Sequence, residues 1–146
     1  MNADPQAGPW MPRIQQLPKL GTVGVLKPCC TGSTGGITVG GPVTLATTGL
    51  TNLSLITTGG ITVSNPLTVN NGANATLTLN TTDTATQSAA ITATNLALLG
   101  SGGNYTLNNP GNLIGTVAAN TGSVNLTSSG AVTIGAAGGV TGWTTT

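Results

Sequence analysis

The sequence has no His, no Phe and almost no charge, and these absences exclude several classes of function. Of 146 residues, three are Lys or Arg and two are Asp or Glu, so charged residues make up 3%, against about 25% in an ordinary soluble domain. The basic residues are Arg13, Lys19 and Lys27, all near the N-terminus. Binding to nucleic acid needs clustered Lys or Arg. We therefore expect no nucleic-acid partner.

The side chains that catalysis and metal binding require are also missing. Acid–base catalysis needs a positioned His, carboxylate or Lys, and the only carboxylates are Asp4 and Asp83. Paired carboxylates of the kind that cleave sugars, and the Asp in every turn of calcium-binding solenoids, are absent. Cys29 and Cys30, without His, cannot complete a tetrahedral zinc site. We predict no enzyme activity, no catalytic residue, no metal site and no cofactor.

Long apolar runs are missing as well. No stretch approaches the roughly 18 apolar residues of a membrane-spanning helix, so we expect no membrane insertion. Residues 1–34 contain Pro5, Pro9, Pro12, Pro18 and Pro28. Proline removes a backbone donor and breaks helices and ladders, which predicts an irregular lead-in or cap over this segment. The segment also lacks the basic-then-apolar layout of a secretory signal.

A repeat begins at Gly35. Residues 35–58 read GGITVGGPVTLATTGLTNLSLITT and residues 59–82 read GGITVSNPLTVNNGANATLTLNTT, with 11 of 24 positions identical. Each block contains three apolar–Thr/Ser–apolar triplets, separated by Gly, Pro and Asn. A period of two places both apolar side chains on one face of a strand and the hydroxyl on the other. Each block is therefore predicted to contain three short strands joined by turns.

Three strands that recur every 24 residues are typical of one coil of a β-solenoid, because stacked coils bury an inner face that one coil leaves exposed. The predicted fold class is all-β, with residues 35–146 forming a parallel β-solenoid of about four to five coils. Equivalent side chains of successive coils should stack about 4.8 Å apart. A β-sandwich, which also uses short alternating strands, is the alternative, although it needs no repeat of this length.

Further apolar pairs continue the pattern less regularly. The expected pairs are Ile91/Ala93, Leu96/Leu98 and Tyr105/Leu107 in a third coil, and Val117/Ala119, Val124/Leu126 and Val132/Ile134 in a fourth. The segment NTTDTATQSAA, residues 80–90, then becomes a loop that bulges from the stack, with Asp83 in solvent. The final TGWTTT is expected to form a partial fifth turn, with Trp143 covering the end.

Outward threonines are the candidate binding residues. Stacking would place Thr38 beside Thr62, Thr44 beside Thr68 and Ser54 beside Thr78, with Thr76 and Thr78 on one strand. One interpretation is a regular face of hydroxyls and methyls that binds ice, a glycan or another fibre. The other is that Thr is simply an uncharged residue with high β propensity. The candidate residues are Thr38, Thr44, Thr62, Thr68, Thr76 and Thr78.

Residues 91–135, ITATNLALLGSGGNYTLNNPGNLIGTVAANTGSVNLTSSGAVTIG, with the phrases GGITV and GAVTIG, resemble the strand-repeat regions of filamentous-haemagglutinin-type exoproteins. The resemblance covers roughly residues 35–139. It implies a right-handed parallel β-helix that is exported from a Gram-negative bacterium and displayed as a fibre. It also implies a structural or adhesive role, extracellular or at the cell surface, with host or neighbouring-cell glycans or proteins as partners. Open coil ends, which leave strand edges unpaired, predict self-association.

Overall fold

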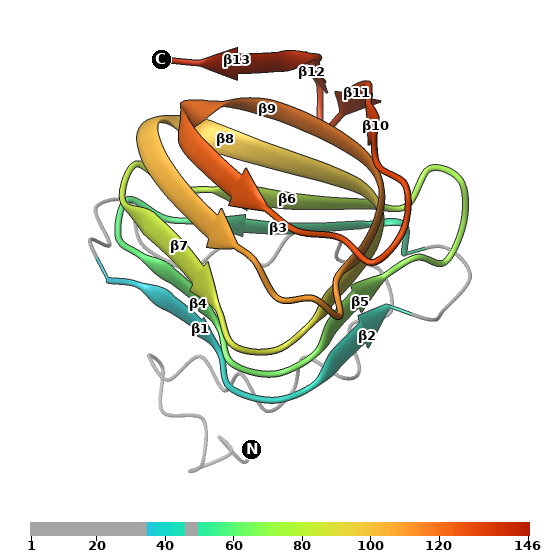
Figure 1. Cartoon of the computed structure of the whole chain (residues 1–146). Coiled ribbons are helices and arrows are strands. Elements are labelled where there is room, and N and C mark those ends of the chain that lie inside the picture. The colour runs from blue at the N-terminus through green and yellow to red at the C-terminus, as the bar shows by residue number, and fades with distance from the viewer. Residues whose placement is uncertain (1–34, 46–49) are drawn as a thin grey trace, which may run out of the picture.

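The computed structural model describes residues 35–45 and 50–146, and these residues contain strands and no helix (Figure 1). The predicted irregular segment at residues 1–34 lies outside the described part. The strands are β1 (Ile37–Val39), β2 (Val43–Leu45), β3 (Asn52–Ile56), β4 (Ile61–Val63), β5 (Leu67–Val69), β6 (Thr76–Asn80), β7 (Thr84–Gln87), β8 (Ile91–Leu107), β9 (Leu113–Leu126), β10 (Thr133–Ile134), β11 (Ala136–Ala137), β12 (Val140–Thr141) and β13 (Trp143–Thr145).

The strands stack into three parallel ladders around a common core. Ladder 1 contains β1, β4, β7 and the C-terminal parts of β8 and β9. Ladder 2 contains β2, β5 and the N-terminal parts of β8 and β9. Ladder 3 contains β3, β6, the middle parts of β8 and β9, and then β10 and β13. Figure 1 shows the chain climbing through these ladders in right-handed turns. The predicted β-solenoid is confirmed, with about five turns.

The register between the first two coils is the predicted one. Thr38 pairs with Thr62, Thr44 with Thr68 and Ser54 with Thr78. The neighbouring strands are parallel, which excludes the antiparallel sheets of a β-sandwich. An in-register stack follows because each coil presents the same apolar columns to the next.

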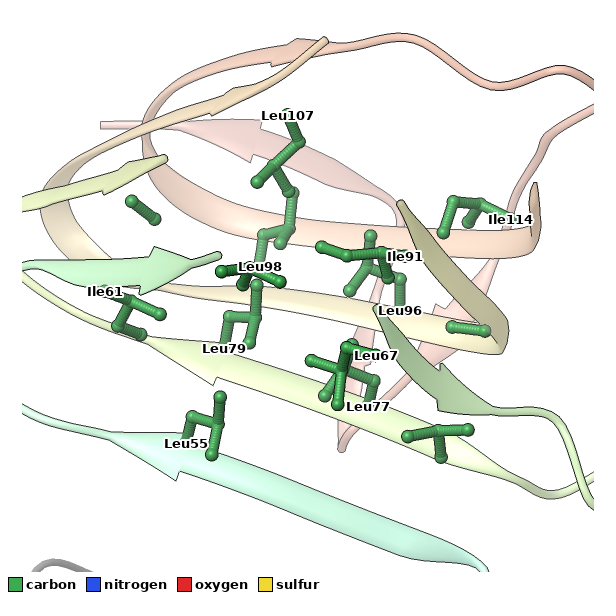
Figure 2. Packing of buried hydrophobic residues seen from close by; sticks show 14 of the residues in the cluster. Leu55, Ile61, Leu67, Leu77, Leu79, Ile91, Leu96, Leu98, Leu107 and Ile114 are labelled. Atoms are coloured by element: carbon green, nitrogen blue, oxygen red, sulfur yellow. The ribbon is translucent and has the colours of Figure 1, made fainter. Parts of the chain in front are cut away.

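Those columns form one continuous hydrophobic core. Leu55 pairs with Leu79, which in turn pairs with Leu98, and all three side chains are buried (Figure 2). The core contains Leu, Ile, Val and Ala, and its largest side chain is that of Tyr105. Burial of apolar area, at about 25 cal/mol per Å², therefore supplies the main stabilisation of a chain that has almost no charge.

The predicted loop at residues 80–90 is wrong. Residues Thr84–Gln87 form β7, which lies between β4 and β8 in ladder 1 and pairs Ala85 with Ile61. The third coil therefore begins at β7, and Ile91/Ala93 belongs to ladder 2 instead of starting a coil. The inward positions of β7 are a small Ala85 and a polar Gln87, which breaks the apolar pattern. Asp83 is exposed, as predicted.

The corners between ladders are shorter in the later coils than in the first two. Ladder 2 passes directly into ladder 3 within β8 and again within β9, at Thr94 and Gly115. A Cβ on Gly115 would lie 2.7 Å from the Thr94 carbonyl oxygen, so this tight corner needs glycine. The three pairs expected for coil three all lie in strands, each one place further around the coil than expected, in ladders 2, 3 and 1. Of the pairs expected for coil four, Val117/Ala119 lies in ladder 3 and Val124/Leu126 in ladder 1, whereas Val132 lies outside β10.

The C-terminal strands form a partial fifth turn, as predicted. Ile134 of β10 pairs with Val117, and Trp143 of β13 pairs with Ala119. Between them, residues 135–142 leave the stack as a hairpin, β11–β12, closed by a 2.7 Å hydrogen bond from the Gly142 N–H to the Gly135 carbonyl. Trp143 remains 37% exposed, so it covers the end of the core only in part.

Candidate functional site

The six candidate threonines lie on three different faces of the solenoid. Thr38 and Thr62 point outward from ladder 1, Thr44 and Thr68 from ladder 2, and Thr76 and Thr78 from ladder 3. A flat target can touch only one face, so these residues cannot act as one planar surface. Each face must be judged separately.

Ladder 1 carries the longest threonine row. Thr62 pairs with Thr86, and Thr86 pairs with Thr106, so the row runs Thr38, Thr62, Thr86, Thr106, and all four are exposed. At the strand spacing the row is about 14 Å long. Thr86 and Thr106 were not among the predicted residues, because β7 was expected to be a loop. The alternation in TATQ was the signal that could have placed Thr86.

Ladder 2 has a shorter row. Thr44, Thr68 and Thr92 stack in register, and the next residue outward is Leu113, which is 51% exposed. The hydroxyl pattern therefore ends after three coils. On ladder 3 the outward positions above Thr78 are Ala97 and Ala118, which are covered by the hairpin.

Polar side chains inside the solenoid satisfy the backbone at the corners. Thr57 Oγ1 donates to the Gly35 carbonyl at 2.7 Å and Thr81 Oγ1 to the Gly59 carbonyl at 2.6 Å. Thr121 Oγ1 does the same to Gly100 at 2.8 Å. These buried hydroxyls bind one coil to the coil beneath it, which indicates a structural role.

Tyr105 forms the most perturbed titratable site in the described part of the chain. Its hydroxyl accepts from the Thr81 N–H at 3.2 Å and shares its single proton between two carbonyls, those of Leu79 (2.8 Å) and Leu99 (2.6 Å). Burial raises the pKa of this phenol from 10.0 to about 12, and the Thr81 hydrogen bond opposes the rise. With 1% of its surface exposed, Tyr105 cannot reach a substrate.

No cluster of metal-binding residues occurs among residues 35–45 and 50–146. Within the same residues, no helix is long and apolar enough to cross a membrane. Asp83 is the sole charged residue of that part, and its Oδ1 accepts the Thr84 N–H at 2.8 Å.

The outer face of ladder 3 is hollowed where the hairpin stands beside it. The groove has a volume of about 810 Å³ and is lined by β3, β6, the loop before β6 and the hairpin. Thr76 and Thr78 line it, so two of the six predicted residues belong to this groove and the other four do not.

The fold defines the class of protein as a β-solenoid. Comparison with protein-family models, curated protein sequences and solved structures gives no match.

Proposed function

We propose that this chain is a non-catalytic structural segment of a bacterial fibre protein, extracellular or displayed at the cell surface, where it also contributes to adhesion. The observation that carries the proposal is the C-terminal end of the stack. Ile134 and Trp143 continue the inward columns of Val117 and Ala119, yet they are 61% and 37% exposed. An apolar column that ends in solvent favours the addition of another coil.

The rest of the surface supports the same role. The side faces of the solenoid present Thr, Asn and Ser, and ladder 1 carries no charged side chain. A surface of this kind suits lateral exposure to water and weak, repeated contacts with glycans or proteins of a neighbouring cell. Catalysis needs positioned acids, bases or nucleophiles, and Asp83 is the one charged side chain among the described residues.

Self-association through the coil end is the first test. We expect the purified chain to grow in mass with concentration in sedimentation velocity experiments. Ile134→Lys should shift this association to concentrations at least about tenfold higher, because it places a charge on the end of the core. The matched control is Leu113→Lys, which changes a 51% exposed residue on a side face and should leave association unchanged. A mass that stays that of one chain at every concentration would contradict the proposal.

A second candidate function is binding to an ordered surface such as ice or a crystalline glycan, and the row on ladder 1 favours it. Four exposed threonines in register make a regular strip of hydroxyls and methyls. Replacing Thr62 and Thr86 by Lys should abolish inhibition of ice recrystallisation, because Lys is too long for a flat contact. Thr68→Lys, on ladder 2, is the control and should keep the activity. Equal behaviour of all variants would exclude the row as the binding surface.

A further inference from the structure

The groove beside the hairpin is a candidate ligand site. Its volume of about 810 Å³ lies within the range of small-ligand sites, about 300–1,000 Å³. Its floor is the outer face of β3 and β6, one wall is the hairpin, and the other is the loop at Ala73 and Asn74. Figure 1 shows the hairpin strands β11 and β12 near β10 and β13, at the C-terminal end of the stack.

The hairpin wall is held firmly against the stack. Ala137 is buried against Ala97 and Ala118, the small outward residues of β8 and β9. Gly138 and Gly139 have φ values of 57° and 84°, the left-handed pair of a type I′ turn. A Cβ on Gly138 would lie 2.6 Å from the Ala97 Cβ. The tip of the hairpin therefore touches the sheet, and the wall exists before any ligand binds.

The floor is a small grid of hydroxyls and amides. Asn52 and Ser54 of β3 pair in register with Thr76 and Thr78 of β6, so the four side chains stand in two rows about 4.8 Å apart. All four line the groove. The hydroxyls of Ser54 and Thr78 can donate and accept, and the Asn52 amide has one donor and one acceptor atom. The Thr76 hydroxyl donates to the Asn74 carbonyl and can still accept.

The opposite wall is also fixed by hydrogen bonds. The Asn95 side-chain amide donates to the carbonyls of Ala73 at 2.9 Å and Ala75 at 3.0 Å, which ties the loop to the next coil. Thr76 Oγ1 donates to the Asn74 carbonyl at 3.1 Å. A site whose floor and both walls are held in place loses little conformational entropy when it binds.

We propose that this groove binds a neutral oligosaccharide. No lining residue is charged, so neither a carboxylate nor a phosphate nor a cation would find a counter-charge. Sugar hydroxyls donate and accept hydrogen bonds, as do the Thr and Ser hydroxyls and Asn amides of the floor. The ligand lies across two coils, with successive hydroxyls matched to the rows of β3 and β6. The inference deepens, and rests on, the adhesive part of the proposed function by giving it a place and a ligand class.

An extended peptide is the less favoured occupant. In an antiparallel ribbon, the residues of a non-hydrogen-bonded pair point their N–H and C=O groups outward. The hydrogen-bonded closure at Gly135 and Gly142 makes Ala136 and Thr141 such a pair, and each edge of the hairpin then offers only one outward residue. A peptide strand would gain about two hydrogen bonds there, too few for addition of a strand.

Titration calorimetry of the full chain tests the inference, with cellohexaose, mannohexaose, maltohexaose and chitohexaose as probes. We expect at least one to bind. The double variant Thr76→Val/Thr78→Val removes two floor hydroxyls with little change in shape and should weaken that binding at least about tenfold. The double variant Thr38→Val/Thr62→Val removes two exposed hydroxyls from ladder 1 and should bind as the unaltered chain does. Thermal unfolding of both variants shows that each is folded.

Ala73→Trp adds a second, independent variant, because it fills the groove and removes no hydrogen bond. It should also abolish binding. Oligosaccharide binding that survives Ala73→Trp and the Thr76/Thr78 variant would overturn the groove site and leave the adhesive role standing. Absence of binding by all four probes overturns the ligand class, and cell-binding assays then decide the adhesive role separately. Binding of an unrelated extended peptide, lost in Ala73→Trp, would also overturn the oligosaccharide proposal.

Discussion

Replacing Asn112 by Leu is expected to lower the free energy of unfolding by about 3–5 kcal/mol. The Asn112 side chain is fully buried. Its Oδ1 accepts the Ile91 N–H at 2.8 Å, and its Nδ2 donates to the carbonyls of Leu107 at 2.9 Å and Thr127 at 3.0 Å. Leu has nearly the same shape but cannot make these bonds, so several buried backbone groups would lose their partner.

Gln87 shares this network. The Gln87 and Asn112 amides face each other with both N···O distances at 2.8 Å, and the two Asn112 N–H groups are shared among Gln87 and the two carbonyls. The Leu variant therefore also leaves the buried side of Gln87 without its partner. Urea unfolding followed by circular dichroism measures the loss. Asn125→Leu is the matched control, because Asn125 is exposed on the outer face of β9, and it should change stability by less than about 0.5 kcal/mol. Equal stability of the two variants would show that the network contributes nothing.

The first two coils were predictable from the sequence because their inward positions are all large and apolar. In ladder 1 the apolar pattern is interrupted at β7, where Ala85 and Gln87 take the places of Ile61 and Val63. The reason for Gln87 becomes visible only in three dimensions, since its partner Asn112 lies 25 residues away. A polar pair that replaces an apolar pair across coils leaves no period in the sequence.

The corners were the second obstacle. In the first two coils, clusters of Gly, Pro and Asn mark each turn, but in β8 the chain changes ladder at Thr94 with only a single Asn95 beside it. Most of the later strands were therefore identified, with β7 missed, while their positions around the coil were not. The stacking of Thr38 on Thr62 was correct, whereas the extension of that row to Thr86 and Thr106 depended on β7.

The groove was harder to predict from the sequence than the strands or the corners. It exists because residues 135–142 leave the fifth turn and fold back on the outside of the stack. The sequence AAGGVT does contain the Gly-Gly pair typical of a tight hairpin. Where that hairpin packs is decided by Ala97 and Ala118, two small outward residues in strands whose other outward positions are larger, and this match appears only once the register is known.

Raising the pH from 10 to 12 is expected to destabilise the protein by about 2 kcal/mol through Tyr105 alone. The unfolded chain releases the phenol proton near pH 10, whereas burial holds the folded pKa at about 12. Between these values the unfolded state binds fewer protons, so the free energy of unfolding falls by at most about 1.4 kcal/mol per pH unit. The stabilisation is complete below pH 10 and is lost as the pH approaches the folded pKa.

Tyr105→Phe separates this effect from general alkaline denaturation. The variant should be less stable by about 1–2 kcal/mol at neutral pH, because the Leu79 carbonyl and the Thr81 N–H lose the hydroxyl. Its stability should then stay flat where that of the unaltered chain falls, so the two curves converge as the pH rises. Tyr105 is the only tyrosine, so phenolate absorbance reports its ionisation directly. Parallel curves for the two proteins would mean that the buried phenol is not the group that titrates.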